Sequence, residues 1–184
     1  MSICGDLGLA LRRTRRCSSL AVHWGPRAGP DGASVGLLEP GRALEDMKKV
    51  LIVDDEQSIL IYLTTVLEDT GYATCSAIDG QEGLSVARRE RPDLVCLDVM
   101  MPKRSGVSLY EEIKRDPDLR PVPVMFISAY NQIRDLRDPV AFRKMISDTS
   151  IPQPELCMEK PIKVPEFLEA VAKLTGEGPP PEKD

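Results

Sequence analysis

The feature that most constrains the fold is an alternation of short apolar runs with amphipathic stretches from residue 48 onward. Five runs have the length and composition of strands, at residues 49–53, 72–77, 94–98, 124–128 and 156–159. Between them, apolar residues recur at the spacing of a helix that buries one face. Strands that alternate with helices in this way form a parallel sheet with helices packed on its faces.

The pattern predicts an α/β chain with a doubly wound (βα)5, flavodoxin-like parallel sheet of strand order 2-1-3-4-5. The segment between Ser128 and Lys160 is longer than the roughly 20 to 28 residues that a helix, a strand and two loops need. Asp138-Pro139 has the form of an N-cap and a first helical position within it. We therefore expect an extended region around the fourth helix, with two short helices near 131–138 and 139–147. Asp79, followed by Glu82, predicts the start of the second helix.

The domain limits follow from composition. The chain has 184 residues, 42% of them hydrophobic, enough for one ordinary core. Residues 1–46 are rich in Arg, Gly and Pro without periodicity, which predicts a disordered extension or a mispredicted start before Met47. The folded domain is expected at 47–175, followed by a polar tail at 176–184. A net charge of -5 and the lack of an apolar run of about 20 residues argue against nucleic-acid binding and membrane insertion.

The cysteines and the histidine exclude several kinds of site. Five cysteines form no CxxC pair, so a disulfide framework or a zinc site is disfavoured and a reducing, cytoplasmic location is expected. Cys75, Cys96 and Cys157 lie in strand-like runs and are expected to be small buried thiols. The one histidine, His23, precedes the folded domain, which excludes a catalytic Ser/His/Asp or Cys/His set there.

Polar residues stand at the carboxyl ends of four predicted strands: Asp54-Asp55, Asp98, Ser128 and Lys160. In an open α/β sheet these ends meet where ligands bind. Three converging carboxylates repel each other unless a cation neutralises them, and Mg2+ is the natural candidate. Ser128 and Lys160 would then stabilise a phosphoryl group arriving at a carboxylate. Asp98, alone on the central strand, is the best nucleophile, although each residue taken singly is an ordinary loop residue.

The chain resembles the receiver domain of response regulators, in which VLIVDDE, LVCLDVMMPKRSG, VMFISA and MEKPI occur in this order. The resemblance covers about residues 47–175 and implies that Asp98 is the phosphorylated residue. It implies that Mg2+ is bound by Asp54, Asp55, Asp98 and the backbone carbonyl of Met100. It also implies that Ser128 and Lys160 contact the phosphoryl oxygens, and that Pro161 follows through a cis bond.

The resemblance further implies a set of partners. The phosphodonor would be a sensor histidine kinase or a histidine phosphotransfer protein, and the output would pass to a separate downstream effector, because no DNA-binding domain follows. A homodimer would form through the face made by the fourth helix, the fifth strand and the last helix.

One departure from the family pattern affects how the domain would switch on phosphorylation. Cys157 stands where the family usually has an aromatic residue. Met100 and Tyr130 are bulky and cannot position a water. We therefore predict that the phosphorylated domain loses its phosphoryl group slowly.

Three other classes of protein share parts of this pattern. A phosphatase with an aspartate nucleophile would carry an acidic residue two positions after it, where this chain has Met100. A dinucleotide-binding module would need a Gly-rich turn after the first strand, where this chain has DDEQS. A receiver-like module that binds partners without phosphorylation stays open. The chain is therefore expected to be a signalling domain and not an enzyme.

Overall fold

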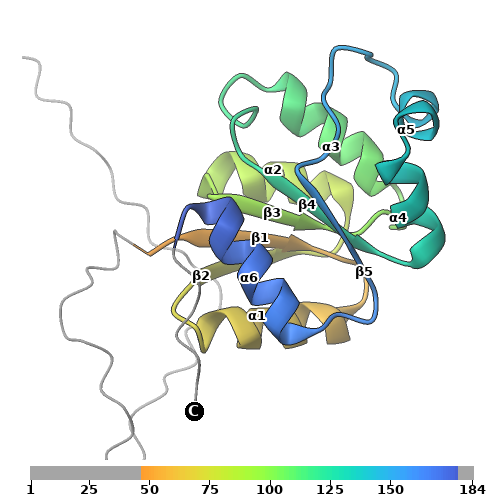
Figure 1. Ribbon diagram of the computed structural model, residues 1–184. Coiled ribbons are helices and arrows are strands. Elements are labelled where there is room, and N and C mark those ends of the chain that lie inside the picture. Colours follow the sequence, from red (N-terminus) through yellow and green to blue (C-terminus); the bar gives the residue numbers. More distant parts are fainter. Residues whose placement is uncertain (1–46, 178–184) are drawn as a thin grey trace, which may run out of the picture. The chain divides into compact units, whose positions relative to one another are not determined.

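The computed structural model describes residues 47–177, and it contains a parallel sheet with helices on both faces (Figure 1). The expected extension at 1–46 and residues 178–184 of the expected tail lie outside the described residues. The strands are β1 (Lys49–Val53), β2 (Ala73–Ala77), β3 (Leu94–Leu97), β4 (Val124–Ser128) and β5 (Leu156–Glu159). The helices are α1 (Gln57–Glu68), α2 (Gly80–Glu90), α3 (Gly106–Arg115), α4 (Tyr130–Arg137), α5 (Pro139–Met145) and α6 (Val164–Thr175).

The sheet has the order β2-β1-β3-β4-β5 with every pairing parallel, which confirms the predicted fold. The register aligns the carboxyl ends of the strands, since Val53 pairs with Leu97 and Ser128 pairs with Glu159. The residues that follow these ends are therefore held at one edge of the sheet.

Two apolar layers hold the helices against the sheet. Successive strand residues point to opposite faces, so Val50 and Ile52 join one layer while Leu51 and Val53 join the other. The first layer is completed by residues of α1 and α6, and the second by residues of α2, α3, α4 and α5. Figure 1 shows α1 and α6 on one side of the sheet and α2, α3 and α4 on the other. Cys96 and Cys157 are buried thiols as expected, whereas Cys75 on the edge strand β2 is only half-buried.

The start of α2 shows how local sequence sets an element. Asp79 Oδ1 accepts hydrogen bonds from the amides of Gln81 and Glu82, both at 2.9 Å. Glu82 reaches back to accept from the amide of Ile78 at 3.0 Å. The expected N-cap with a returning carboxylate is confirmed. It satisfies two backbone amides of the first turn and the amide just before the cap.

The extended region consists of two short helices, as the sequence predicted. Asp138 separates α4 from α5, and its Oδ1 accepts from the amides of Val140 at 2.8 Å and Ala141 at 2.7 Å. Phe142 of α5 is fully buried, with its ring 6.2 Å from that of Tyr110 on α3. The second helix ends at Met145, earlier than the expected 147. An aromatic anchor therefore makes α5 part of the core.

Two further features concern one peptide bond and the character of the helices. The Lys160–Pro161 peptide bond is cis, as the resemblance implied. Within residues 47–177, none of the helices combines the length and apolar character needed to span a bilayer.

Candidate functional site

Four of the predicted site residues meet at the carboxyl edge of the sheet. Asp54 follows β1, Asp98 follows β3, Ser128 ends β4 and Lys160 follows β5. The Lys160 ammonium lies 2.8 Å from Asp54 Oδ2 and 3.0 Å from Asp98 Oδ1. The Ser128 hydroxyl donates to the same Asp98 oxygen at 3.1 Å. Asp98 Oδ1 thus has both a cation and a hydroxyl donor.

Backbone hydrogen bonds continue the sheet past the strand ends and fix these residues. The amide of Asp54 donates to Ala77 O at 3.2 Å, that of Asp98 to Val53 O at 2.9 Å, and that of Lys160 to Ser128 O at 2.9 Å. Each functional side chain therefore starts from a backbone that its neighbouring strand holds in place. Rigid elements position a site more accurately than free loops do.

The loop after Asp98 packs closely on that residue. A Cβ added at Gly106 would lie 1.9 Å from the carbonyl oxygen of Asp98, so only glycine fits at the start of α3. The amide of Met100 donates to Asp98 Oδ2 at 2.5 Å. Both carboxylate oxygens of Asp98 therefore have donors, one from the neighbouring strands and one from its own loop.

Burial and charge act in opposite directions at this site. Asp54 and Asp98 are almost fully buried, and the Lys160 side chain is 20% exposed. Burial raises the pKa of Asp98; Lys160 opposes this and Asp54 adds to it, so the net pKa lies above the usual value. Burial alone would lower the pKa of Lys160, but its bonds to Asp54 and Asp98 outweigh it and raise the pKa. The ammonium therefore stays charged between two carboxylates.

Two further acidic residues, Asp55 and Glu56, directly follow Asp54 in the chain. Asp55 is exposed, and among the described residues no hydrogen bond or ion pair joins its carboxylate to the cluster. Glu56, which sequence reasoning did not single out, places Oε1 3.7 Å from the Lys160 ammonium. Its position directly after Asp54-Asp55 was the available signal. Met100 and Tyr130 are 64% and 59% exposed, so both side chains project into solvent.

The donor set suits a hard cation. In the described part of the chain, no three His, Cys, Asp or Glu side chains are already gathered as metal ligands. The site nevertheless has two buried carboxylates, Asp54 and Asp98, and one ammonium between them, with Asp55 and Glu56 adding negative charge nearby. Oxygen donors with excess negative charge are what Mg2+ requires.

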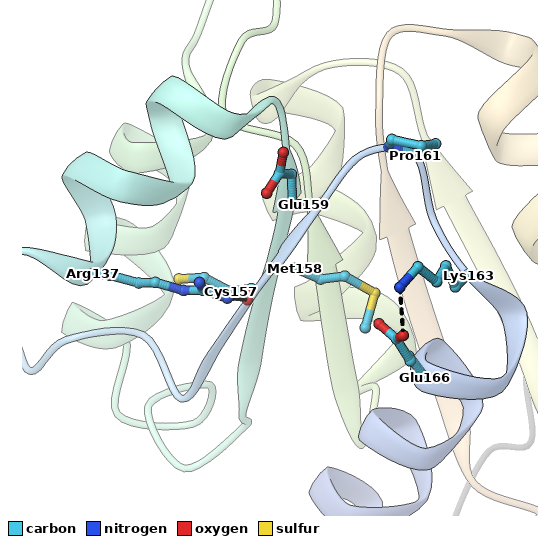
Figure 2. Close-up of a pocket in the computed structure, with 7 residues that line it drawn as sticks. All are labelled: Arg137, Cys157, Met158, Glu159, Pro161, Lys163 and Glu166. Carbon is cyan, nitrogen blue, oxygen red and sulfur yellow. Dashed lines mark hydrogen bonds and ion pairs between the residues drawn. The ribbon is translucent and has the colours of Figure 1, made fainter.

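A separate pocket lies beside β5, the strand at the edge of the sheet (Figure 2). It has a volume of about 450 Å³ and is lined by Arg137, Cys157, Met158, Glu159, Pro161, Lys163 and Glu166. In Figure 2, Arg137 and Cys157 lie together at one side, away from the ion pair between Lys163 and Glu166. The pocket therefore adjoins the strand that carries Lys160 without including Asp98.

Comparison with known proteins gives this geometry a family. The model of the response regulator receiver domain matches residues 50–144. The chain is 31% identical over 130 residues to the polar-differentiation response regulator DivK of Brucella anthropi, a match that covers 71% of this chain and 98% of DivK.

The chain also matches longer relatives, and it shares its fold with solved structures. The chain is 45% identical over 92 residues to the probable transcriptional regulator ycf27 of Guillardia theta, covering 50% of this chain. It spans only about a third of the length of that relative and of its Porphyridium aerugineum counterpart, 35% in each case. The receiver domain of the sensor histidine kinase PA1611 of Pseudomonas aeruginosa has the same fold, with a TM-score of 0.59 at 21% identity over 71% of this chain and 99% of that one. From the family model and the DivK match, the chain belongs to the response regulator receiver domains of two-component signalling.

Proposed function

We propose that this receiver domain accepts a phosphoryl group on Asp98 from a phosphohistidine of a sensor histidine kinase or a histidine phosphotransfer protein. The observation that carries the proposal is the convergence of the Ser128 hydroxyl and the Lys160 ammonium on one oxygen of Asp98. A carboxylate oxygen of Asp98 forms the new bond to phosphorus while the phosphorus–nitrogen bond to histidine breaks. The electron pair of that bond leaves with the imidazole nitrogen.

Ser128 and Lys160 would act on the group that is transferred. Phosphoryl transfer leaves a protein little covalent chemistry to perform, so catalysis depends on positioning and charge stabilisation. The ammonium of Lys160 neutralises phosphoryl oxygens, and the hydroxyl of Ser128 donates to them. Because Asp54 is buried and holds Lys160 at 2.8 Å, it keeps the ammonium at the site before the donor arrives.

Magnesium is part of the proposal. Asp54, Asp55, Asp98 and the backbone carbonyl of Met100 would hold it, and the ion would supply positive charge that lets an anionic donor approach several carboxylates. The PA1611 receiver domain was solved with magnesium coordinated in its active site cleft. The excess of carboxylates over ammonium groups at this site supports the same requirement here.

We further propose that the protein acts as a stand-alone regulator in the cytoplasm, with a separate effector downstream. The DivK match supports this, because it spans 98% of a response regulator. A homodimer through the face formed by α4, β5 and α6 belongs to the same proposal, and the pocket beside β5 lies on that face. The buried thiols Cys96 and Cys157 are consistent with a reducing compartment.

The test is phosphorylation of the full chain by a small phosphodonor such as phosphoramidate, with Mg2+ or with EDTA, read by intact mass. Wild type is expected to gain one phosphoryl group with Mg2+ only. Asp98→Asn should gain none, whereas Asp69→Asn, an exposed aspartate at the end of α1, should behave as wild type. A gain by Asp98→Asn would exclude Asp98 as the acceptor.

The same samples separate the alternatives. Sustained release of phosphate from a phosphate ester would indicate an aspartate-nucleophile phosphatase. The absence of any phosphoryl gain, together with the absence of Mg2+ affinity, would favour a module that binds partners without phosphorylation.

A further inference from the structure

We propose that Arg137 is a positioning residue that couples Asp98 to the free edge of the sheet. Its hydrogen bond to the carbonyl of Cys157 holds α4 against β5 while Asp98 is unmodified, and phosphorylation of Asp98 weakens that bond. This inference rests on the proposed function and adds a regulatory role to a residue outside the site.

The bond lies on the outer side of an edge strand. Arg137 is the last residue of α4, and its guanidinium donates to Cys157 O at 2.7 Å. Alternate residues of a strand turn their backbone groups to opposite sides. The amide of Lys160 faces β4 by donating to Ser128 O, so the backbone groups of residue 157 face the free edge. Arg137 therefore reaches over β5 from outside and supplies a donor that no strand provides.

The side chain at position 157 makes this contact available. Cys157 is small and 9% exposed, and Figure 2 shows the Arg137 side chain lying beside it. Gln153 strengthens the junction, because its amide donates at 3.3 Å to the carbonyls of both Leu136 and Arg137. The end of α4 is thus joined to β5 and to the loop before it by three side-chain hydrogen bonds, of which Arg137 supplies the shortest.

The two segments that Arg137 joins are the same two that hold Asp98. Ser128 lies two residues before α4 begins, and Lys160 lies three residues after Cys157. Both side chains contact Asp98 Oδ1, and their backbones are bonded to each other. The α4 segment and the β5 segment are therefore connected at Asp98 and again at Arg137, one helix length away.

Phosphorylation changes the first connection. A phosphoryl group on Asp98 would bring additional anionic oxygens to the place where Ser128 and Lys160 now share one carboxylate oxygen. Both groups would reorient toward the new oxygens and move the starts of α4 and of the β5–α6 loop. A packed structure responds to such a shift by exchanging one set of contacts for another. Of the three side-chain hydrogen bonds at the far end of α4, the one from Arg137 reaches β5 itself, and it is the contact that this movement would strain.

The consequence would reach the pocket beside β5. Lys163 is already paired with Glu166 at 2.8 Å, whereas Arg137 has a backbone carbonyl as its acceptor and no carboxylate within ion-pair distance among the described residues. Release of Arg137 would present an unpaired guanidinium at this pocket. Phosphorylation would thus change the charge that a partner meets there.

Thermodynamic linkage gives a test that a merely structural role would not pass. If phosphorylation weakens the Arg137 bond, then removing the bond must favour phosphorylation. We would measure phosphoryl gain on the full chain from phosphoramidate with Mg2+ for wild type, Arg137→Met and Arg134→Met, as initial rate and as the extent reached when gain balances hydrolysis. Arg134 lies one turn earlier on α4 and pairs only with its neighbour Asp135 among the described residues, so it controls for the lost charge.

Arg137→Met is expected to raise the ratio of phosphorylated to unmodified protein at this balance by about two- to tenfold, the range for one hydrogen bond. Arg134→Met should match wild type. Arg137→Lys keeps the charge and has a shorter side chain that can still donate, so its ratio should lie between those of wild type and Arg137→Met. Hydrogen exchange of residues 130–137 should increase on phosphorylation of wild type. In Arg137→Met it should already be high and change little.

Normal phosphorylation of Asp98 with the same extent in Arg137→Met and wild type would overturn this inference and leave the proposed function standing. An equal increase in Arg134→Met would also overturn it, because charge alone would then explain the effect. No phosphoryl gain in any variant would overturn the proposed function and this inference together. If Arg137→Met does not fold, Arg137→Lys decides, and an unchanged extent there overturns the coupling.

Discussion

Lys160 is the residue on which the stability of the site depends. Its ammonium lies between two buried carboxylates, Asp54 and Asp98, and Glu56 lies 3.7 Å away. Removing one partner of a buried ion pair leaves uncompensated charge in a medium of low dielectric constant. The lysine thus stabilises the folded state as well as contributing to the proposed chemistry.

We predict that Lys160→Met lowers the free energy of unfolding by about 2 to 4 kcal/mol, below the usual range for a buried pair because the ammonium is partly exposed. Urea unfolding with and without Mg2+ measures this, and added Mg2+ should restore more stability in the variant than it adds to wild type. Lys163→Met is the matched control, since that lysine is exposed and should change stability by less than about 0.5 kcal/mol. An equal loss in both variants would contradict the prediction.

Under the proposed function, the side chains of Met100 and Tyr130 would limit how water reaches a phosphoryl group on Asp98. Both side chains are exposed, and neither carries a group that holds a water as a base would. We predict a slowly hydrolysing phosphoprotein, and Met100→Asn, which can hold a water, should shorten its lifetime several-fold. Loss of the added mass after the donor is removed gives the lifetime. A wild-type lifetime of only seconds would refute the prediction.

At the scale of elements, α3 holds the part of the extended region that lies between α5 and β5. Glu111 accepts from the amide of Ser147 at 2.5 Å and from that of Asp148 at 3.2 Å. The hydroxyl of Tyr110 donates to Pro152 O at 3.0 Å, and Lys114, which is almost fully buried, donates to Glu155 at 2.6 Å. One face of α3 therefore fixes the path of the chain from α5 into β5, and β5 leads to Lys160.

The boundary between α4 and α5 depends on Asp138. We predict that Asp138→Ala lowers the free energy of unfolding by about 1 kcal/mol, because two amides of α5 lose their acceptor. Asp138→Asn should stay close to wild type, since asparagine caps a helix about as well as aspartate. Chemical denaturation of the three proteins distinguishes these outcomes. A loss of similar size in both variants would show that charge, and not capping, matters at this position.

For the whole molecule, part of the dependence of stability on pH follows from three carboxylates whose pKa values differ from their usual range. The pKa values of Asp79, Asp116 and Asp148 are lowered, mainly by hydrogen bonds from Lys103, Arg88 and Ser150 respectively. A carboxylate whose pKa is lower in the folded state stabilises that state above its unfolded pKa of about 4, and the contribution is lost as the pH falls through the folded value.

We therefore predict a urea midpoint that, as far as these carboxylates contribute, changes little near neutral pH and falls once the pH drops below about 4. The pKa values of Lys103 and Lys163 are raised by Asp79 and Glu166, so their contributions are full below about pH 10 and are lost only above it. Unfolding curves between pH 3 and pH 8 measure this loss of stability on acidification. A midpoint that rises on acidification to pH 3 would contradict this account.

The site shows where prediction from sequence succeeds and where it ends. Asp54, Asp98, Ser128 and Lys160 could be placed together because each follows a recognisable apolar strand, and parallel strands bring their carboxyl ends to one edge. Asp55 belongs to the same motif as Asp54, yet its side chain is exposed. Neighbouring residues at a strand end point to different sides, and the spacing alone did not decide which carboxylate would face Lys160.

The sequence by itself determined the order of elements, the strand arrangement and the two short helices of the extended region. These depend on periodicity, caps and turn residues, which act over a few positions. Only the tertiary structure decided that Glu56 approaches Lys160, that Glu111 holds the segment before β5, and that Arg137 reaches the carbonyl of Cys157. Such contacts join residues from different elements, and their existence depends on how helices pack on the sheet, which local sequence does not encode.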